Sequence, residues 1–192
     1  SSDLCGGGRS EGSLEQYLTQ QMAAPFFPVD FKHLEAQFTF GCEWPTTGTL
    51  GSLEITPIVL SHPNGGYGFR FVENGKVFVF LSDNELGYPH PGGRSRAEYE
   101  AFCRDADLLI HDAQYSGEEY ENRRGWGHTS YPDATDLALA ANVKRLVLFH
   151  HDPDRTDDEL DAQLARCRER IAAAGSPLAC DAAWEGMEIS LE

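Results

Sequence analysis

Gly127-His128-Thr129-Ser130 opens the stretch that decides the fold; a helical segment follows it, and then the apolar strand Leu146–Phe149 runs into His150-His151-Asp152. The stretch places His128 and His150 at opposite ends of one helix–strand unit. In an α/β fold, ligands and catalytic groups collect at the carboxyl ends of the strands. The stretch therefore predicts an α/β fold with a site at this edge of the sheet.

Two earlier strands also end on polar side chains. The first is predicted over Leu53–Leu60 and leads into a glycine-rich turn that carries His62. The second closes a hairpin over Phe69–Leu81, whose Asn74-Gly75 dipeptide is typical of a type I′ turn. Asp83 follows this hairpin, so a carboxylate leaves an apolar strand, where it is either a cap or a ligand.

His62, Asp83 and His150 share one property, because each follows the carboxyl end of a separate apolar strand. We expect these strands to be neighbours in one mixed sheet that gathers the three side chains at one edge. Imidazole and carboxylate suit Zn²⁺, Mn²⁺ or Fe²⁺. The spacing contains no H-x-x-x-H or C-x-x-C pair, so the residues alone indicate a candidate metal site and nothing more specific.

Local signals predict the remaining elements. Three capping boxes, which begin at Ser13, Ser95 and Thr156, precede amphipathic segments. Helices are predicted over residues 14–24, 95–105, 116–124, 130–141 and 156–175, and further strands over residues 37–40, 107–110, 145–149, 178–182 and 187–191. His90 lies in a loop rich in proline and glycine and is predicted to be solvated.

Length and composition predict a single globular domain over residues 1–192, with a helical lead-in segment over residues 1–34. The five cysteines are scattered and form no C-x-x-C pair, which argues against a disulfide framework and a structural zinc knuckle. A reducing cytoplasm is therefore the expected location. No apolar run approaches the roughly 18 residues that span a bilayer, so no membrane partner is expected.

Acidic residues dominate the charge, since 31 Asp and Glu face 15 Lys and Arg and the formal net charge is -16. Such a surface repels polyanions, and long nucleic acids are bound through lysine and arginine contacts to many phosphates. Long nucleic acid is therefore not an expected partner, whereas a small phosphate ester held at a metal is compatible with the charge. Whether the chain forms a homodimer stays an open question.

The order of the motifs resembles the C-terminal half of the metallo-β-lactamase-fold hydrolases. The resemblance rests on His62 after a strand, Asp83 after the next hairpin, His111-Asp112, Gly127–Ser130 and Leu148–Pro153. It covers residues 53–154 and is closest to the phosphodiesterase branch. That branch includes tRNA 3′-processing endonucleases and cyclic phosphodiesterases.

The resemblance implies an αββα sandwich with two divalent cations, zinc in the first place and manganese or iron as alternatives. In that family His62 would bind the first metal, Asp83 would bridge both metals, and His150 would bind the second. His128 matches a catalytic histidine that donates a proton to the leaving oxygen beside the scissile phosphate.

The family's H-x-H-x-D-H motif, which supplies further metal ligands, is absent from the 192 residues, and His33 stands alone. In the family this motif precedes the region where the present chain begins. The sandwich is therefore expected to be incomplete at its N-terminus, with this chain forming the C-terminal portion of the domain. Neither metal would then be fully coordinated, and the chain as given is expected to be inactive.

The leading hypothesis is a two-metal phosphodiesterase that acts, at full length, on small cyclic or linear phosphodiesters. One alternative is a non-catalytic module that binds a nucleotide or a partner on a degenerate fold of the same kind. The other is a thioester or lactone hydrolase that uses the same metal core.

Overall fold

The structure is a computed structural model that describes residues 2–5, 14–41 and 48–191. The chain divides into two compact units, Ser1–Gly48 and Thr49–Glu192, and each is described by itself. No helix among the described ranges is long and apolar enough to cross a membrane. That all residues belong to one domain stays a prediction.

The first unit contains two short parallel strands, β1 (Ser2–Cys5) and β2 (Phe38–Gly41), the helix α1 (Leu14–Gln21) and the 3₁₀ helix η1 (Phe31–His33). Its aromatic side chains pack locally, with the ring centroids of Phe31 and Phe38 4.8 Å apart. The helix ends three residues earlier than predicted. Its predicted cap, Ser13, lies outside the described residues.

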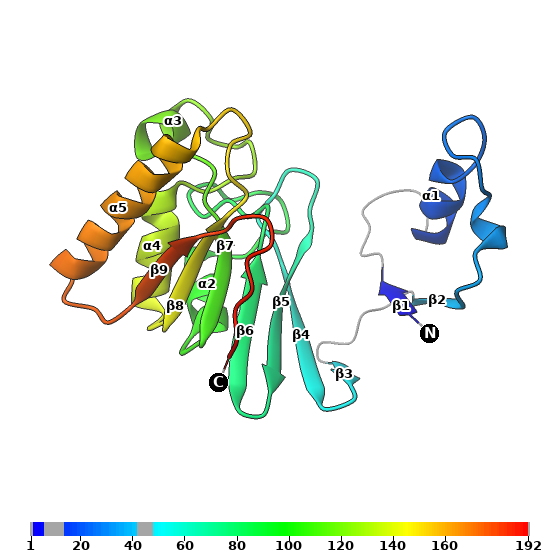
Figure 1. Cartoon of the computed structure of the whole chain (residues 1–192), viewed down its shortest axis with the longest axis horizontal. Helices are drawn as coiled ribbons and strands as arrows, with labels where there is room; N and C mark the ends of the chain where they lie inside the picture. The colour runs from blue at the N-terminus through cyan, green and yellow to red at the C-terminus, as the bar shows by residue number, and fades with distance from the viewer. Residues whose placement is uncertain (1, 6–13, 42–47, 192) are drawn as a thin grey trace. The chain divides into compact units, whose positions relative to one another are not determined.

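The second unit is built on a seven-stranded sheet with the order β3-β4-β5-β6-β7-β8-β9 (Figure 1). Strands β4 to β6 are antiparallel, and β6 to β9 are parallel. The strands are β3 (Gly48–Leu50), β4 (Leu53–Val59), β5 (Tyr67–Glu73), β6 (Lys76–Leu81), β7 (Leu108–Asp112), β8 (Arg145–Phe149) and β9 (Ala179–Ala182). This mixed sheet with packed helices confirms the α/β class.

The strand order corrects one expectation. The strands that precede His62, Asp83 and His150 are β4, β6 and β8, which lie in one mixed sheet but are separated by β5 and β7. They are not direct neighbours, because a hairpin partner and a parallel crossover strand are inserted between them. All three run in the same direction, so their carboxyl ends still meet at one edge.

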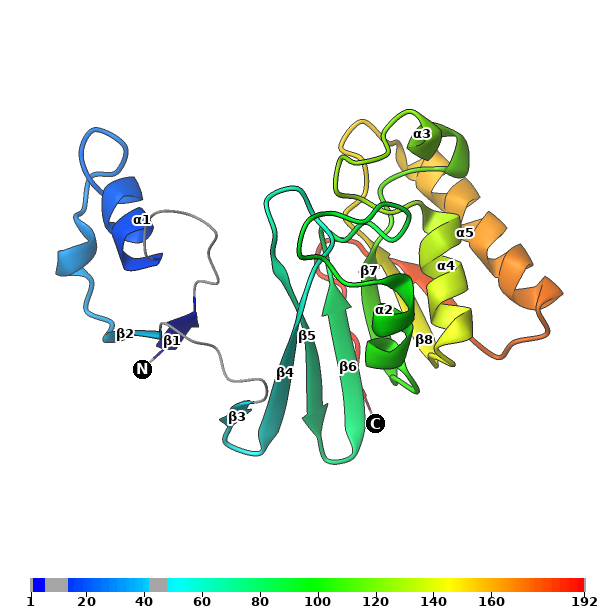
Figure 2. The same cartoon turned by 180° about the vertical axis from the view of Figure 1, so that it is seen from behind.

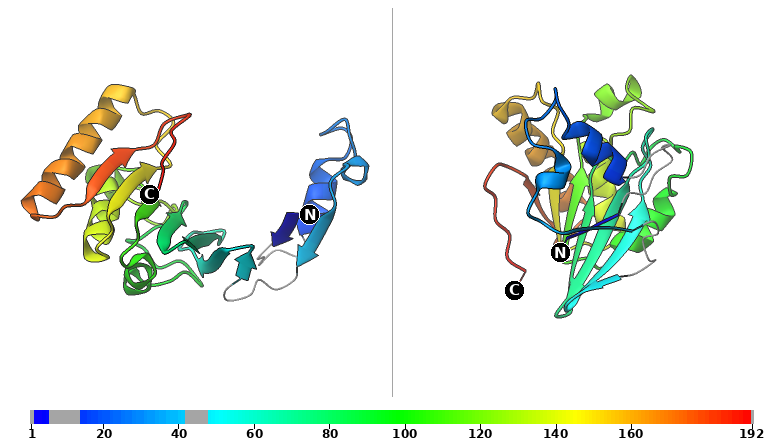
Figure 3. Two further views of the ribbon diagram at one scale, coloured as in Figure 1. Left: turned by 60° about the horizontal axis from the view of Figure 1, so that its bottom comes forward. Right: turned by 90° about the vertical axis from the view of Figure 1, so that its right-hand side faces the viewer.

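Helices cover one face of this sheet, as Figure 2 and the left view of Figure 3 show. They are α2 (Arg96–Cys103), α4 (Tyr131–Ala140) and α5 (Asp157–Ala173), whereas the short helix α3 (Gly117–Glu121) lies beyond the carboxyl ends of the strands (Figure 1). The predicted capping boxes at Ser95 and Thr156 are both formed, and Ser130 caps α4. Fully buried side chains of β6, β7 and β8, such as Leu109 and Leu146, form the core with α4.

The opposite face of the sheet is rich in phenylalanine, with the rings of Phe71 and Phe78 stacked at 5.3 Å. The chain after β9 runs across this face (Figure 1). Leu191 shares a cavity with Phe71 and Phe78. The strand predicted over Met187–Leu191 is wrong, since these residues are extended without belonging to a strand. The apolar side chain of Leu191 lines that cavity, and the segment pairs with no described strand.

Candidate metal and catalytic site

Two of the predicted ligands have an unusual backbone conformation. Asp83 follows β6 with φ 52°, and His150 follows β8 with φ 56°. This left-handed region is uncommon for residues other than glycine, although Asp, Asn and His enter it more readily than most. Such strained positions cluster at functional sites. The turn out of each strand directs the side chain toward the shared edge.

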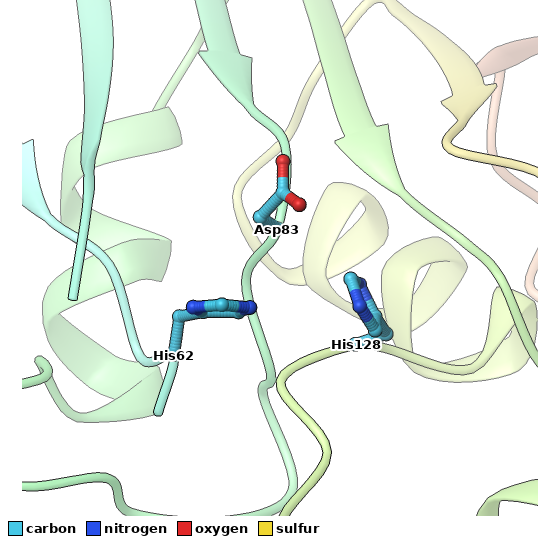
Figure 4. Close-up of side chains that lie close together, drawn as sticks. All are labelled: His62, Asp83 and His128. Carbon is cyan, nitrogen blue, oxygen red and sulfur yellow. The ribbon is translucent and has the colours of Figure 1, made fainter. Parts of the chain in front are cut away.

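The sheet edge brings the predicted residues together. The Oδ1 atom of Asp83 lies 3.1 Å from Nε2 of His150. The rings of His128 and His150 stack with their centroids 4.5 Å apart, and the rings of His62 and His128 are 5.7 Å apart. Figure 4 shows His62, Asp83 and His128 directed toward one space, each from a different loop.

The donor atoms are spaced closely enough to share a cation. His62, Asp83 and His128 each offer one ligand atom within 4.8 Å of the others, and so do Asp112, His128 and His150. Ligands around a tetrahedral Zn²⁺ at about 2.0 Å lie about 3.3 Å apart, so small rotations of the side chains suffice. Nδ1 of His150 is buried and has no hydrogen-bond partner among the described residues. The donor set therefore fits a divalent metal, and the metal-ligand roles of His62, Asp83 and His150 stay a prediction.

The electrostatics of the site favour the metal-binding forms of His62 and Asp83. Burial, and next the charge of His128, lower the pKa of His62, which favours the neutral imidazole. Burial by itself would raise the pKa of Asp83. The hydrogen bond from Ser82 and the charges of His150, His128 and His62 outweigh burial and lower that pKa, so the carboxylate is ionised.

His128 is held by a carboxylate that the sequence did not single out as a site residue. Its Nδ1 lies 2.7 Å from Oδ2 of Asp112, whose side chain is fully buried. Burial would lower the pKa of His128, but the hydrogen bond and charge of Asp112 outweigh it and raise the pKa. Because Nδ1 donates to Asp112, Nε2 is the nitrogen left for chemistry. The sequence did contain a signal for Asp112, because this carboxylate ends the buried strand β7.

The other histidines near the site are structural. His111 is fully buried, and its Nδ1 lies 2.6 Å from the carbonyl oxygen of Asp112. Nε2 of His151 lies 3.2 Å from the carbonyl oxygen of Ala183. The prediction that His90 is solvated is wrong, because its side chain is 5% exposed and Nε2 lies 2.7 Å from the buried carboxylate of Glu85. The loop folds inward, which no local pattern indicated.

Comparison with known proteins decides the family. Residues 13–151 match the family model described as the beta-lactamase superfamily domain. The chain belongs to this superfamily. Its resemblance to the metallo-β-lactamase-fold hydrolases, inferred from motif order, is therefore confirmed.

The curated relatives that the chain matches include proteins named ribonuclease Z. The chain is 35% identical to ribonuclease Z of Gemmatimonas aurantiaca over 82 residues, which make up 41% of this chain and 26% of the relative. It is 33% identical to ribonuclease Z of Bacillus cereus over 133 residues, which make up 62% of this chain and 43% of the relative. The chain thus spans less than half the length of these relatives.

Solved structures show the same fold. The metallo-β-lactamase-fold protein YhfI of Bacillus subtilis matches with a TM-score of 0.62 and 18% identity, covering 96% of this chain and 62% of that protein. A diphosphatase from the PhnP family matches with a TM-score of 0.57 and 20% identity, covering 84% of this chain and 53% of that protein. Human tRNase Z, short form, matches with a TM-score of 0.54 and 22% identity, covering 76% of this chain and 46% of that protein.

Gly127 is a further residue of this superfamily site whose role only the structure shows. It has φ +101°, and a Cβ atom at this position would lie 2.7 Å from Nε2 of His62 and 2.7 Å from Cδ of Pro63. Any side chain there would collide with a predicted metal ligand. The glycine therefore lets the loop that carries His128 approach the turn that carries His62.

One arginine lies beside the site. The guanidinium of Arg123 is 2.9 Å from Asp152 and lies over the rings of Tyr115 and Trp126, at 5.0 Å and 5.9 Å from their centroids. The ring of Tyr115 in turn meets His128 edge-on at 6.1 Å. Asp152 neutralises this arginine, so the edge of the site carries little net positive charge.

Proposed function

We propose that the protein containing this chain is a metal-dependent phosphodiester hydrolase. The observation that carries the proposal is the convergence of His62, Asp83, His128 and His150 at one sheet edge, with His128 fixed by the buried Asp112. Membership of the beta-lactamase superfamily and the similarity to proteins named ribonuclease Z support it.

His62, Asp83 and His150 would hold two divalent cations, with the carboxylate of Asp83 between the two imidazoles. Zinc suits a set of nitrogen and carboxylate donors, and manganese or iron are the alternatives. When bound, such cations stabilise negative charge on phosphate oxygens. The chain prepares the site by keeping His62 neutral and Asp83 ionised.

His128 would act as the general acid. Its Nδ1 donates to Asp112, which orients the ring and stabilises the protonated form. Nε2 faces the ligand cluster, where the oxygen of a departing alcohol would lie. The hydrogen bond and charge of Asp112 raise the pKa of His128, although burial opposes them, and so favour the protonated ring. The same arrangement serves phosphodiesters better than thioesters, because an alkoxide leaving group needs a proton more than a thiolate does.

We further propose small cyclic or linear phosphodiesters as the substrates. The net charge of -16 opposes any polyanion, and Arg123 beside the site is paired with Asp152. A small diester needs only the metal ligands and His128. The competing candidate is structured RNA, which the relatives named ribonuclease Z favour.

The test is hydrolysis of bis-p-nitrophenyl phosphate by the complete gene product with Zn²⁺ or Mn²⁺. We expect His128→Ala to lower kcat about 100-fold with little change in metal content. His33→Ala is the matched control, since His33 is exposed and lies in the first unit. Metal and nucleotide binding without turnover would instead support the non-catalytic module, and faster cleavage of a thioester or lactone would support the third hypothesis.

A further inference from the structure

The segment that follows Asp83 is buried and tied to the turn that carries His62. Asn84 and Glu85 are 0% and 1% exposed. The Oδ1 atom of Asn84 accepts a hydrogen bond from the backbone N–H of Ser61 at 2.9 Å, and the N–H of Glu85 donates to the carbonyl oxygen of Ser61 at 2.8 Å. Residue 61 directly precedes His62, so this segment sets the position of two predicted metal ligands.

The carboxylate of Glu85 accepts four hydrogen bonds, all at 2.7 Å. Oε1 accepts from the Tyr120 hydroxyl and the Gly125 N–H, and Oε2 accepts from His90 Nε2 and the Gly127 N–H. The four hydrogen bonds use every acceptor direction of this buried carboxylate.

Two of the four donors belong to the loop that carries His128. Glu85 holds the backbone at Gly125 and Gly127, and Asp112 holds the next two residues through the His128 ring and the Thr129 N–H at 3.1 Å. Thr129 adds a second tie to the segment after Asp83. Its hydroxyl donates to the carbonyl oxygen of Asn84 and accepts from the N–H of Leu86 at 3.0 Å.

We infer that Glu85 is a positioning residue, which fixes the Gly125–Thr129 loop so that Nε2 of His128 faces Asp83 and His62. The contact network joins the segment after Asp83, the residue before His62 and the His128 loop into one unit. The inference rests on the proposed function only for the role of His128 as a general acid. The statement that Glu85 fixes the loop can be tested without any activity.

Replacing Glu85 by glutamine tests this inference with almost no change in shape. The amide has one acceptor oxygen and one NH₂ group in place of two acceptor oxygens. Tyr120 and His90 can both switch to accept a hydrogen bond from the NH₂ group. A backbone N–H cannot, so in either orientation of the amide Gly125 or Gly127 loses its partner.

The first measurement needs no catalysis and uses the full chain. In a Trp44→Phe, Trp184→Phe background, the fluorescence anisotropy of Trp126 reports on the loop, and the ¹⁵N shifts of the His128 ring report on its Nδ1–H bond to Asp112. We expect Glu85→Gln to lower the anisotropy and to broaden or shift the ring signals. Glu98→Gln, which alters a capping carboxylate on α2, should change neither signal.

The second measurement separates positioning from general stability. In the complete gene product with zinc, Glu85→Gln should lower kcat at least about tenfold with KM changed less than about twofold, because a displaced proton donor affects the transition state and not substrate binding. The loss should be larger for a diester with an alkyl leaving group than for bis-p-nitrophenyl phosphate, whose leaving group needs a proton least. Tyr120→Phe removes a donor outside the loop and should reduce stability alone.

If Glu85→Gln does not fold, Thr129→Val replaces it, because that change removes the other tie between the loop and the segment after Asp83. Thr129→Val should likewise lower the anisotropy of Trp126, broaden or shift the ¹⁵N signals of the His128 ring, and lower kcat. Unchanged Trp126 and His128 signals in the variant that folds overturn the inference. Changed signals in a protein that hydrolyses no phosphodiester support the positioning role and refute the proposed function instead.

Discussion

Asp83 and His150 face each other across the carboxyl ends of β6 and β8, with Oδ1 of the first 3.1 Å from Nε2 of the second. Both residues have a left-handed backbone, and strand β7 lies between their strands. An ionised carboxylate and an imidazole held in this way form an ion pair only when the ring is protonated. A divalent cation between them would satisfy both groups.

Replacing Asp83 by Asn is expected to lower Zn²⁺ affinity by more than the roughly 10–100-fold effect of altering an outer-shell partner, because a carboxylate that lies beside His150 and groups with His62 loses its charge. Isothermal titration calorimetry measures this change. Asp105→Asn is the matched control, since Asp105 also has a positive φ, 53°, but lies outside the site. Equal zinc affinities for the two variants would contradict the ligand role of Asp83.

Residues 1–192 are expected to bind divalent metal weakly and to hydrolyse little or nothing. The three predicted ligands, His62, Asp83 and His150, are few for two cations, and the 192 residues contain no H-x-H-x-D-H motif. Metal content after dialysis against a chelator and turnover of bis-p-nitrophenyl phosphate test this expectation. Stoichiometric, chelator-resistant zinc together with turnover would show that the expectation is wrong.

Gly127→Ala is expected to lower the free energy of unfolding by about 2 kcal/mol or more, because a Cβ atom combines an unfavourable positive φ with a collision against His62. Chemical denaturation measures this loss. Gly117→Ala serves as the control. A Cβ atom at Gly117 meets no heavy atom within 4 Å, so this variant should be unchanged or up to about 1 kcal/mol more stable.

Stability should fall in acid through Glu119. Hydrogen bonds from Arg155, the largest cause, lower the pKa of Glu119 from 4.5 to about 2, although burial opposes them. Because the folded pKa lies below the unfolded value, this stabilisation is complete above about pH 4.5 and is lost as the pH falls toward 2. The side chain is 35% exposed, so screening reduces its contribution to about 1 kcal/mol.

Thermal denaturation at pH 6 and pH 3 tests this pH dependence. Glu119→Gln should be less stable than the parent at pH 6, and the difference should be smaller at pH 3. Glu118→Gln, which alters an exposed carboxyl on the same helix, should keep the parent's pH dependence. An unchanged Tm difference at the two pH values would refute a contribution from the Glu119–Arg155 pair.

The complete gene product should prefer mononucleotide-sized phosphodiesters to structured RNA, because a net charge of -16 on these residues repels a polyanion. The comparison is kcat/KM for a cyclic mononucleotide against that for a precursor tRNA, each at low and high salt. A higher value for the tRNA with a steep salt dependence would refute the preference, since such a slope indicates many phosphate contacts.

Local sequence determined the hairpin turn and the starts of two helices. The Asn74-Gly75 turn has φ values of 51° and 75°, as the predicted hairpin requires, and Ser95 and Thr156 form their capping boxes. These features depend on residues within four positions of each other, so a sequence pattern contains the whole interaction. The apolar strands before Asp83 and His150 were predictable for the same reason.

Tertiary structure alone decided which side chains meet. His128 pairs with Asp112, which lies 16 positions away in the sequence. Glu85 accepts from Gly127, 42 positions away, and Gly127 packs against His62, 65 positions away. His90 was predicted to be solvated because the carboxylate of Glu85 contacts it only after the loop folds back. Met187–Leu191 alternates like a strand, but the segment crosses a sheet face. The reason is physical: hydrogen bonding and burial depend on distance in space, and a local pattern specifies the conformation of a segment without specifying its neighbours.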